Sequence, residues 1–161
     1  MKVFLVRDIS SEYSRYVVNS ESGILLFSVS GRHTAGSQKM YVQNDDECVA
    51  KIREVRIANI KTNYVSTKED KFHIVVTQKR GKLSAIYHGI GFHIRGDISE
   101  KSYDIMDIDN SVIACVQKRF NTSKETFEIN INNDKYLVHC IVSAVCMNCV
   151  CTTDALALQA T

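Results

Sequence analysis

Two short clusters of basic residues carry the clearest chemistry in the sequence. Lys79, Arg80 and Lys82 surround a glycine in a segment typical of a β-hairpin tip, and Lys118 and Arg119 stand together further along. Several Lys and Arg donors together favour phosphate groups, and each contributes about 1 kcal/mol near an anionic membrane surface. We therefore predict that these residues bind an anionic headgroup. A solvated turn that protects a strand edge is the alternative for the same residues.

Other charged residues have the two-residue spacing of a strand face that points to solvent. They are Lys51, Arg53 and Arg56, with Glu54 among them, and they are predicted to add charge to the outer surface of a sheet. Lys71 and His73, on the strand that leads to the first basic cluster, are grouped with that cluster.

Cysteine and histidine near the C-terminus raise the question of a metal site. Cys146, Cys149 and Cys151 follow His139 and Cys140 in one apolar run. Thiolate and imidazole are preferred zinc ligands, but a structural site needs a second pair of ligands from elsewhere in the chain. Packing explains the same residues, because a buried free cysteine behaves as a small apolar residue. We therefore predict no metal and no cofactor.

The sequence contains no fingerprint of a known catalytic site. The nucleophile elbow, the zinc-protease motif, the P-loop and the Rossmann glycine pattern are all missing. Gly89 and Gly91, which lie between His88 and Phe92, fit a bulge or a tight crossing in a sheet. We therefore predict that the protein is not an enzyme.

Length and composition fit one domain over residues 1–161. A chain of 161 residues buries enough surface to form one core, and a net charge of +2 does not favour nucleic acid as a partner. The six cysteines are crowded rather than spread as loop staples, which predicts reduced thiols. The N-terminal apolar stretch is too short for a signal peptide. We expect a cytoplasmic protein, either free or at the membrane periphery.

Short alternating segments rich in Val, Ile, Tyr and Phe fill the first 133 residues. Proline is absent, and clusters of Asn, Asp and Ser supply the turns. This pattern predicts about ten to twelve antiparallel strands, which close into a barrel to remove exposed edges. Residues 40–53 resemble residues 103–118, which predicts one hairpin used twice.

The pattern changes at residues 136–151, which contain no charged residue and no glycine. An Asn-Asn-Asp segment just before them offers a helix N-cap. As a helix the run spans roughly 24 Å, short of the roughly 30 Å core of a bilayer. A helix that is apolar all round must then be enclosed by protein, which predicts a helix inside the barrel. A buried strand or pair of strands remains the alternative, and residues 152–161 fit a short strand or a frayed end.

An ordered series of segments resembles a known family. The segments are 96–98, 103–107, 112–119, 126–129 and 133–134, with a second series at 16–19, Gly23, Phe27, Val29, Gly31 and 39–42. Their order, followed by the apolar run, is similar to the LURP-one-related family of the tubby C-terminal-like superfamily, which includes phospholipid scramblases.

The resemblance implies a mainly β fold, with a closed antiparallel barrel of twelve strands around a buried hydrophobic C-terminal helix. It also implies lipid-related roles, since the tubby branch binds phosphoinositides through basic side chains. Two features depart from the family pattern: the helix is rich in cysteine, and no segment matches the lipid-contacting motif of the tubby branch residue by residue.

Together these observations predict a non-enzymatic binding module. Its basic loops are expected to bind anionic phospholipid headgroups or a protein partner. The alternatives are a small-molecule carrier or enzyme with a site at a barrel mouth, and a scramblase-like protein that spans the membrane with residues 136–151.

Overall fold

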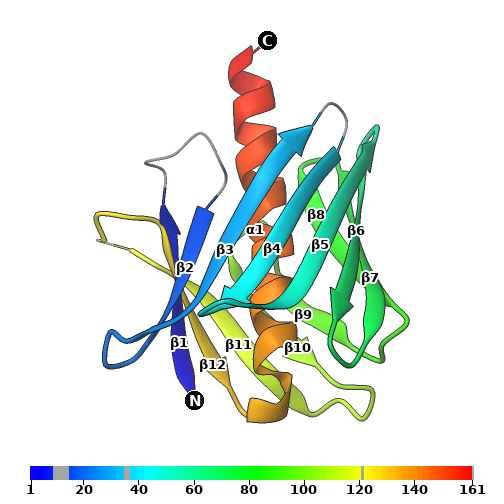
Figure 1. The fold of residues 1–161 in the computed structure, drawn as a ribbon. Coiled ribbons are helices and arrows are strands. Elements are labelled where there is room, and N and C mark those ends of the chain that lie inside the picture. The colour runs from blue at the N-terminus through cyan, green and yellow to red at the C-terminus, as the bar shows by residue number, and fades with distance from the viewer. Residues whose placement is uncertain (9–14, 35–36, 121, 161) are drawn as a thin grey trace.

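The structure is a mainly β barrel with one long helix. The computed structural model describes residues 1–8, 15–34, 37–120 and 122–160, and in the helix it describes side chains as far as Asn148. The strands are β1 (Lys2–Asp8), β2 (Arg15–Ser20), β3 (Leu25–Thr34), β4 (Ser37–Asn44), β5 (Glu47–Ile57), β6 (Ile60–Thr67), β7 (Lys71–Lys79), β8 (Lys82–His88), β9 (His93–Asp97), β10 (Ser102–Met106), β11 (Val112–Arg119) and β12 (Thr126–Ile131). A 3-10 helix, η1 (Asp134–Tyr136), leads into α1 (Leu137–Ala160) (Figure 1).

The strands form one antiparallel sheet that follows the chain. Its order is β8-β7-β6-β5-β4-β3-β2-β1-β12-β11-β10-β9, so consecutive strands are neighbours and β1 also pairs with β12. Among the described residues, β8 and β9 share no ladder of backbone hydrogen bonds. The two strands meet at a seam. Across this seam the Leu83 amide of β8 donates a hydrogen bond to Ser99 Oγ, just after β9, at 3.1 Å. The predicted barrel of twelve strands is confirmed, and it is nearly closed.

Two-residue alternation explains which side chains enter the barrel. In β4, Gln38, Met40 and Val42 are buried, whereas Lys39 and Tyr41 are exposed. Strands β6 and β7 repeat this alternation, because successive side chains of a strand point to opposite faces, whereas β10, β11 and β12 also bury consecutive residues. The inward residues pack against α1 in a single hydrophobic core.

The hairpin repeat predicted from the sequence is confirmed. In the β4–β5 hairpin Val42 faces Ala50, and the register shifts at the next residue. In the β10–β11 hairpin Ile105 faces Ala114, and the register shifts at the same relative position. Both hairpins therefore place one extra residue in the same way, as a β-bulge does.

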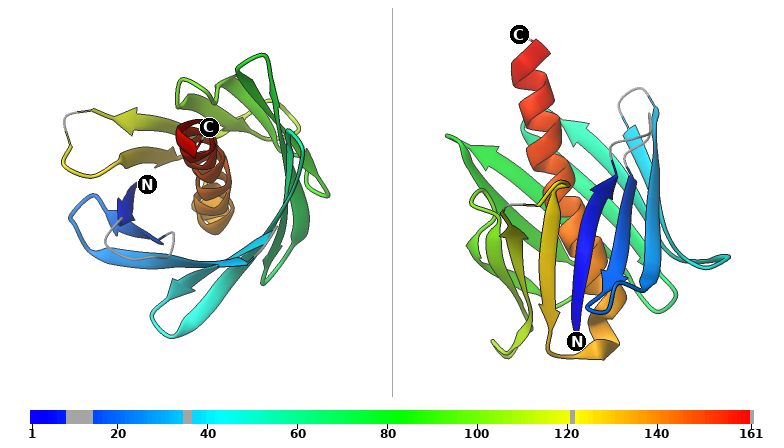
Figure 2. Two further views of the ribbon diagram at one scale, coloured as in Figure 1. Left: turned by 90° about the horizontal axis from the view of Figure 1, so that it is seen from above. Right: turned by 90° about the vertical axis from the view of Figure 1, so that its left-hand side faces the viewer.

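The C-terminal apolar run forms a helix inside the barrel, and the alternative of buried strands is wrong. Viewed from above, α1 lies in the middle of the ring of strands (Figure 2). Its residues from Cys140 to Met147 are each at most 1 % exposed. The predicted N-cap is confirmed, since the Asn133 side chain accepts a hydrogen bond from the Lys135 amide at 3.2 Å. The helix continues through the tail to Ala160.

The antiparallel order places alternate turns at opposite ends of the barrel. The β5–β6, β7–β8, β9–β10 and β11–β12 turns lie at the end toward which α1 runs (Figure 1). We call this the exit end. The helix starts at the opposite end, after β12.

Candidate anion-binding surfaces

The first predicted basic cluster forms the tip of the β7–β8 hairpin. Lys79 and Lys82 are directly opposite each other, and Arg80 and Gly81 make the turn between them with φ of 51° and 77°. Two consecutive positive φ angles are the hallmark of a two-residue type I′ turn. The three basic side chains are exposed, so this short turn presents three cations at the exit end.

The second predicted cluster lies at the same end but not beside the first. Lys118 and Arg119 end β11, and around the ring, across the β8–β9 seam, the β9–β10 hairpin with Asp97 and Glu100 near its tip lies between the two clusters. Arg119 Nε is 2.8 Å from Glu128 Oε2, which offsets part of its charge. The structure thus brings Lys79, Arg80 and Lys82 together and leaves Lys118 and Arg119 as separate contributors at the exit end.

Large apolar side chains are exposed at the exit end as well. Ile57 and Ile60 face each other at the β5–β6 turn, where Ile57 is 73 % exposed. Phe120, which follows Arg119, is 75 % exposed. No motif in the sequence marked these residues as exposed. The exit end therefore combines basic and apolar side chains on its turns.

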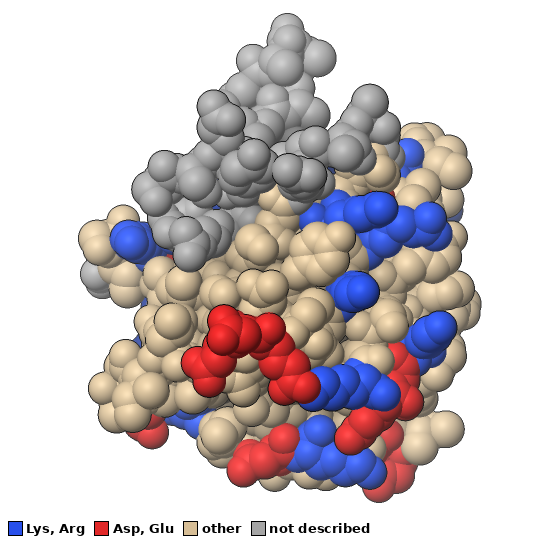
Figure 3. Space-filling model, viewed as in Figure 1, with Lys and Arg blue, Asp and Glu red and all other residues tan. Residues whose placement is uncertain are grey.

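A second basic surface lies on the outer wall of the barrel. Two adjacent cross-strand rows form it: Lys39, Arg53, Tyr64, His73 and His88 face one another in order across β4 to β8, and Tyr41, Lys51, Ser66 and Lys71 do so across β4 to β7. These residues line a groove of about 600 Å³, which we call the basic groove. Figure 3 shows Lys and Arg side chains gathered over the upper part of β4 and β5, with Asp and Glu below them near the β4–β5 turn.

The basic groove contains no carboxylate among its lining residues. The Arg53 guanidinium lies 4.8 Å from the centre of the Tyr64 ring, and the Tyr64 ring contacts the edge of His73 at 4.6 Å between centroids. The three lysines of the groove form no ion pair among the parts of the chain that the structure describes. Gly89, another lining residue of the groove, has φ of 88°, and a Cβ there would stand 3.2 Å from the Lys71 carbonyl oxygen, which confirms the tight crossing predicted for this segment.

One expectation for the outer face of β5 is wrong. Lys51 and Arg53 point to solvent as predicted, but Glu54 is buried inside the barrel. Arg56, on the same inward phase, is half-buried and faces the buried Lys61. Glu54 Oε2 lies 3.2 Å from Nζ of Lys61, which is 2 % exposed. The two-residue period requires this arrangement, because Glu54 falls on the inward phase of the strand, and the buried lysine supplies its counter-charge.

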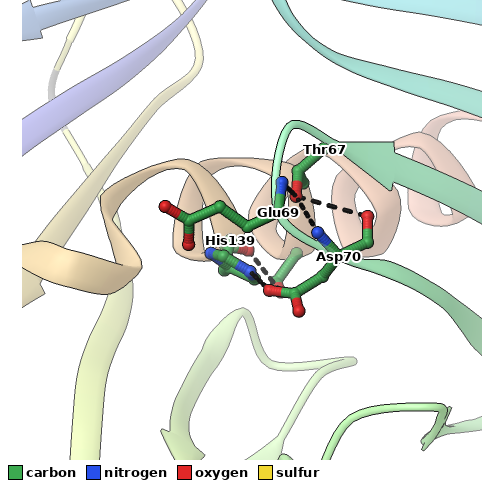
Figure 4. Close-up of polar contacts among 5 residues, drawn as sticks. Thr67, Glu69, Asp70 and His139 are labelled. Carbon is green, nitrogen blue, oxygen red and sulfur yellow. Dashed lines mark hydrogen bonds and ion pairs between the residues drawn. The ribbon is translucent and has the colours of Figure 1, made fainter.

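A hydrogen bond between the buried His139 and the partly exposed Asp70 holds the start of α1 to the wall. His139 Nε2 lies 2.7 Å from Asp70 Oδ2 in the β6–β7 turn (Figure 4). Thr67 Oγ1 fixes that turn, since it accepts hydrogen bonds from the backbone amides of Asp70 at 2.9 Å and Glu69 at 3.3 Å. The ring of His139 stacks on Phe72 at 5.8 Å. These contacts identify the pair as an anchor for the helix.

The two described helix cysteines, Cys140 and Cys146, pack in the core. Cys140 and Cys146 are completely buried, and burial raises the pKa of the Cys140 thiol to about 12. The thiol next to His139 in the sequence is therefore not an activated nucleophile. Cys149 and Cys151 lie outside the described side chains. Among the described residues, no cluster of three or more His, Cys, Asp and Glu has an arrangement that suits a metal ion.

Helix side chains fill the centre of the barrel, and Tyr87 Oη donates to Ser143 Oγ at 2.7 Å across the interface. At the mouth where α1 begins, a small pocket of about 140 Å³ is lined by residues of the β6–β7 turn and of α1, His139 among them. The basic groove, by contrast, lies on the outside. No helix within the described part of the chain has the length and apolar character that a membrane crossing requires.

These features define a class: a meandering barrel wound around its own C-terminal helix, with basic surfaces on its turns and outer wall. The family model of LURP-one-related proteins matches residues 1–148, and the chain belongs to this family. A solved structure of an Arabidopsis thaliana protein has 16 % sequence identity, a TM-score of 0.52, and coverage of 88 % of this chain and 87 % of that one, which supports the fold. No curated protein matches the sequence.

Proposed function

We propose that the protein is a non-enzymatic module that docks its exit end against an anionic membrane. The observation that carries the proposal is the grouping of three exposed cations on one two-residue turn, at the end of the barrel where Ile57 and Phe120 are also exposed. Lys118 and Arg119 add charge at the same end. Basic side chains attract anionic lipid, and apolar side chains on the same turns gain by entering the interface.

The free thiols support a location in a reducing compartment. Cys48, Cys115, Cys140 and Cys146 form no disulfide, and disulfides are rare in the cytosol. We therefore place the docked protein on the cytoplasmic face of a membrane. A protein with an acidic surface is the other partner that the same cations fit.

The size of the electrostatic effect follows from the number of cations. At about 1 kcal/mol for each basic residue, Lys79, Arg80 and Lys82 together contribute about 3 kcal/mol, or roughly a hundredfold in vesicle partitioning. The effect should weaken with salt, because charges near the surface are screened within about 10 Å at 0.1 M.

Vesicle co-sedimentation tests the proposal with two variants of equal charge. In the tip variant, Lys79→Gln/Arg80→Asn/Lys82→Gln, asparagine is chosen at position 80 because it tolerates positive φ. In the groove variant, Lys39, Lys51 and Lys71 are each replaced by Gln. Both variants lose the same charge and keep the fold, since all six side chains are exposed.

The wild type and the groove variant are expected to sediment with vesicles rich in phosphatidylserine and not with neutral vesicles. The tip variant should lose most of this binding. Equal sedimentation of the two variants would show that only net charge matters. Equally low sedimentation of the wild type on acidic and neutral vesicles would reject membrane binding and leave an acidic protein as the partner to seek.

A further inference from the structure

We infer that the basic groove is a separate binding site for a small soluble polyanion that carries at least two phosphate groups. The site differs from the exit end in its residues and in its place on the barrel wall. Its volume of about 600 Å³ is within the range of roughly 300 to 1,000 Å³ that holds small ligands.

The register of the strands brings the cations of the groove together. Lys39 and Arg53 face each other on β4 and β5, about 4.8 Å apart at the backbone. Lys51 lies two residues before Arg53 on the same face, and Lys71 lies two strands from Lys51, about 10 Å away. This spacing suits one phosphate between Lys39 and Arg53 and a second between Lys51 and Lys71.

Electrostatics favour an anion at this site over an empty surface. With no carboxylate in the lining, the four cations repel one another, and a polyanion would relieve that repulsion. Arg53 is held over the face of Tyr64, which orders its guanidinium for bidentate contact with phosphate. Arginine ordered in advance loses less entropy when it binds a ligand.

Hydroxyl and imidazole groups complete the polar lining. Ser66 and Tyr41 carry hydroxyl groups in the same row as Lys51 and Lys71, and His73 directly faces His88 at the other end of the groove. Hydroxyl and imidazole groups donate hydrogen bonds to phosphate oxygens. The groove thus offers both charge and directed hydrogen bonds.

The distance from the exit end favours a soluble ligand over a lipid headgroup. His73 lies six residues before Lys79 on β7, about 20 Å along a strand, and on the other side of the groove Arg53 lies four residues before Ile57 at the end of β5, about 13 Å along a strand. The next outward row, Val55, Thr62, Val75 and Ile86, carries no charge. A protein docked through its exit end, as proposed above, would hold the groove in water, and this choice of a soluble source rests on that proposal.

Titration calorimetry with inorganic tripolyphosphate tests the site, and sulfate serves as the control for a single small anion. The wild type should bind tripolyphosphate much more tightly than sulfate. The groove variant and a second variant, Lys51→Gln/Arg53→Gln, should each bind it at least tenfold more weakly. Each variant loses at least two charge-assisted contacts, and the loss of even one such contact weakens binding about tenfold or more. The tip variant, which has lost the same charge as the groove variant, should bind as the wild type does.

The proposal would be overturned if the wild type and both groove-residue variants bound tripolyphosphate with equal affinity. It would also be overturned if the wild type bound tripolyphosphate no more tightly than sulfate. A competition experiment identifies the source of the phosphate. At a tripolyphosphate concentration that saturates the groove, the wild type should still bind vesicles. If tripolyphosphate instead displaces the wild type from vesicles, and the groove variant is not displaced, then the groove is a lipid headgroup site. Circular dichroism and thermal melting confirm that each variant is folded. Because the tip and groove variants differ, failure of one proposal does not imply failure of the other.

Discussion

The hydrogen bond between His139 and Asp70 gives the sharpest test of how α1 is held in the barrel. A double-mutant cycle with His139→Phe and Asp70→Ala isolates the energy of this contact. A hydrogen bond to a charged group contributes about 1.5 to 3 kcal/mol, but the Asp70 side chain is 43 % exposed, so water recovers part of the loss. We expect a coupling energy of about 1 kcal/mol.

The single replacements should differ for a structural reason. Nδ1 of His139 has no hydrogen-bond partner among the described residues. His139→Phe therefore also removes a buried unpaired atom, and should lower the free energy of unfolding by less than the pair contributes. His139→Ala additionally removes the ring contacts with Phe72, Phe92 and Tyr136, and should cost about 3 to 5 kcal/mol.

Urea unfolding followed by circular dichroism measures each free energy of unfolding. Additivity of His139→Phe and Asp70→Ala within about 0.3 kcal/mol would refute the view that this pair anchors the helix. A cost for His139→Ala no larger than that for His139→Phe would show that the aromatic cluster contributes nothing.

Two further predictions follow from shifted pKa values. The pKa of Glu128 lies below its ordinary 4.5, mainly because the Lys2 ammonium hydrogen-bonds the carboxylate; this stabilisation is present above pH 4.5 and is lost as the pH falls through the lowered pKa. Glu128→Gln should therefore destabilise the protein more at about pH 7 than at about pH 3 in urea unfolding, and a penalty independent of pH would contradict this. Burial, and then the Asp104 carboxylate, raises the pKa of Cys115 to about 11, so iodoacetamide should label Cys115 slowly at about pH 8 and faster in Asp104→Asn, as peptide mass spectrometry would show.

The sequence was sufficient to predict the barrel and its helix. Two-residue alternation set the faces of the strands, and an uncharged run without glycine left α1 no stable place outside protein. The repeated hairpin was also visible, because Val42 with Ala50 and Ile105 with Ala114 occupy matching positions. These features are local, or depend on composition alone.

The basic groove could not be predicted because it depends on register between strands. The two-residue pair of Lys51 and Arg53 was visible as an outward face, and Lys71 and His73 were visible only as residues on the strand before the basic turn. Nothing in the sequence aligns these pairs with each other or with Lys39, which a shift of one residue would move to the inner face. The available signal was that these basic residues occupy outward positions of the two-residue alternation on neighbouring strands.

The buried Glu54 was misjudged for a related reason. A charged residue among other charges suggests solvent, but the inward phase of β5 placed this carboxylate beside Lys61. The charge of Glu54 suggested the outer face of the barrel, whereas the two-residue period of β5 places Glu54 on the inner face.

Fluorescence of a single introduced tryptophan tests the central claim of exit-end docking most directly, because the chain contains no tryptophan of its own. Phe120→Trp places the probe at the exit end, and Tyr41→Trp places it in the basic groove. With phosphatidylserine vesicles, the emission of Phe120→Trp should shift to the blue and be quenched by brominated lipid, while that of Tyr41→Trp stays unchanged. An unchanged Phe120→Trp spectrum, or a shift confined to Tyr41→Trp, would contradict the proposed orientation.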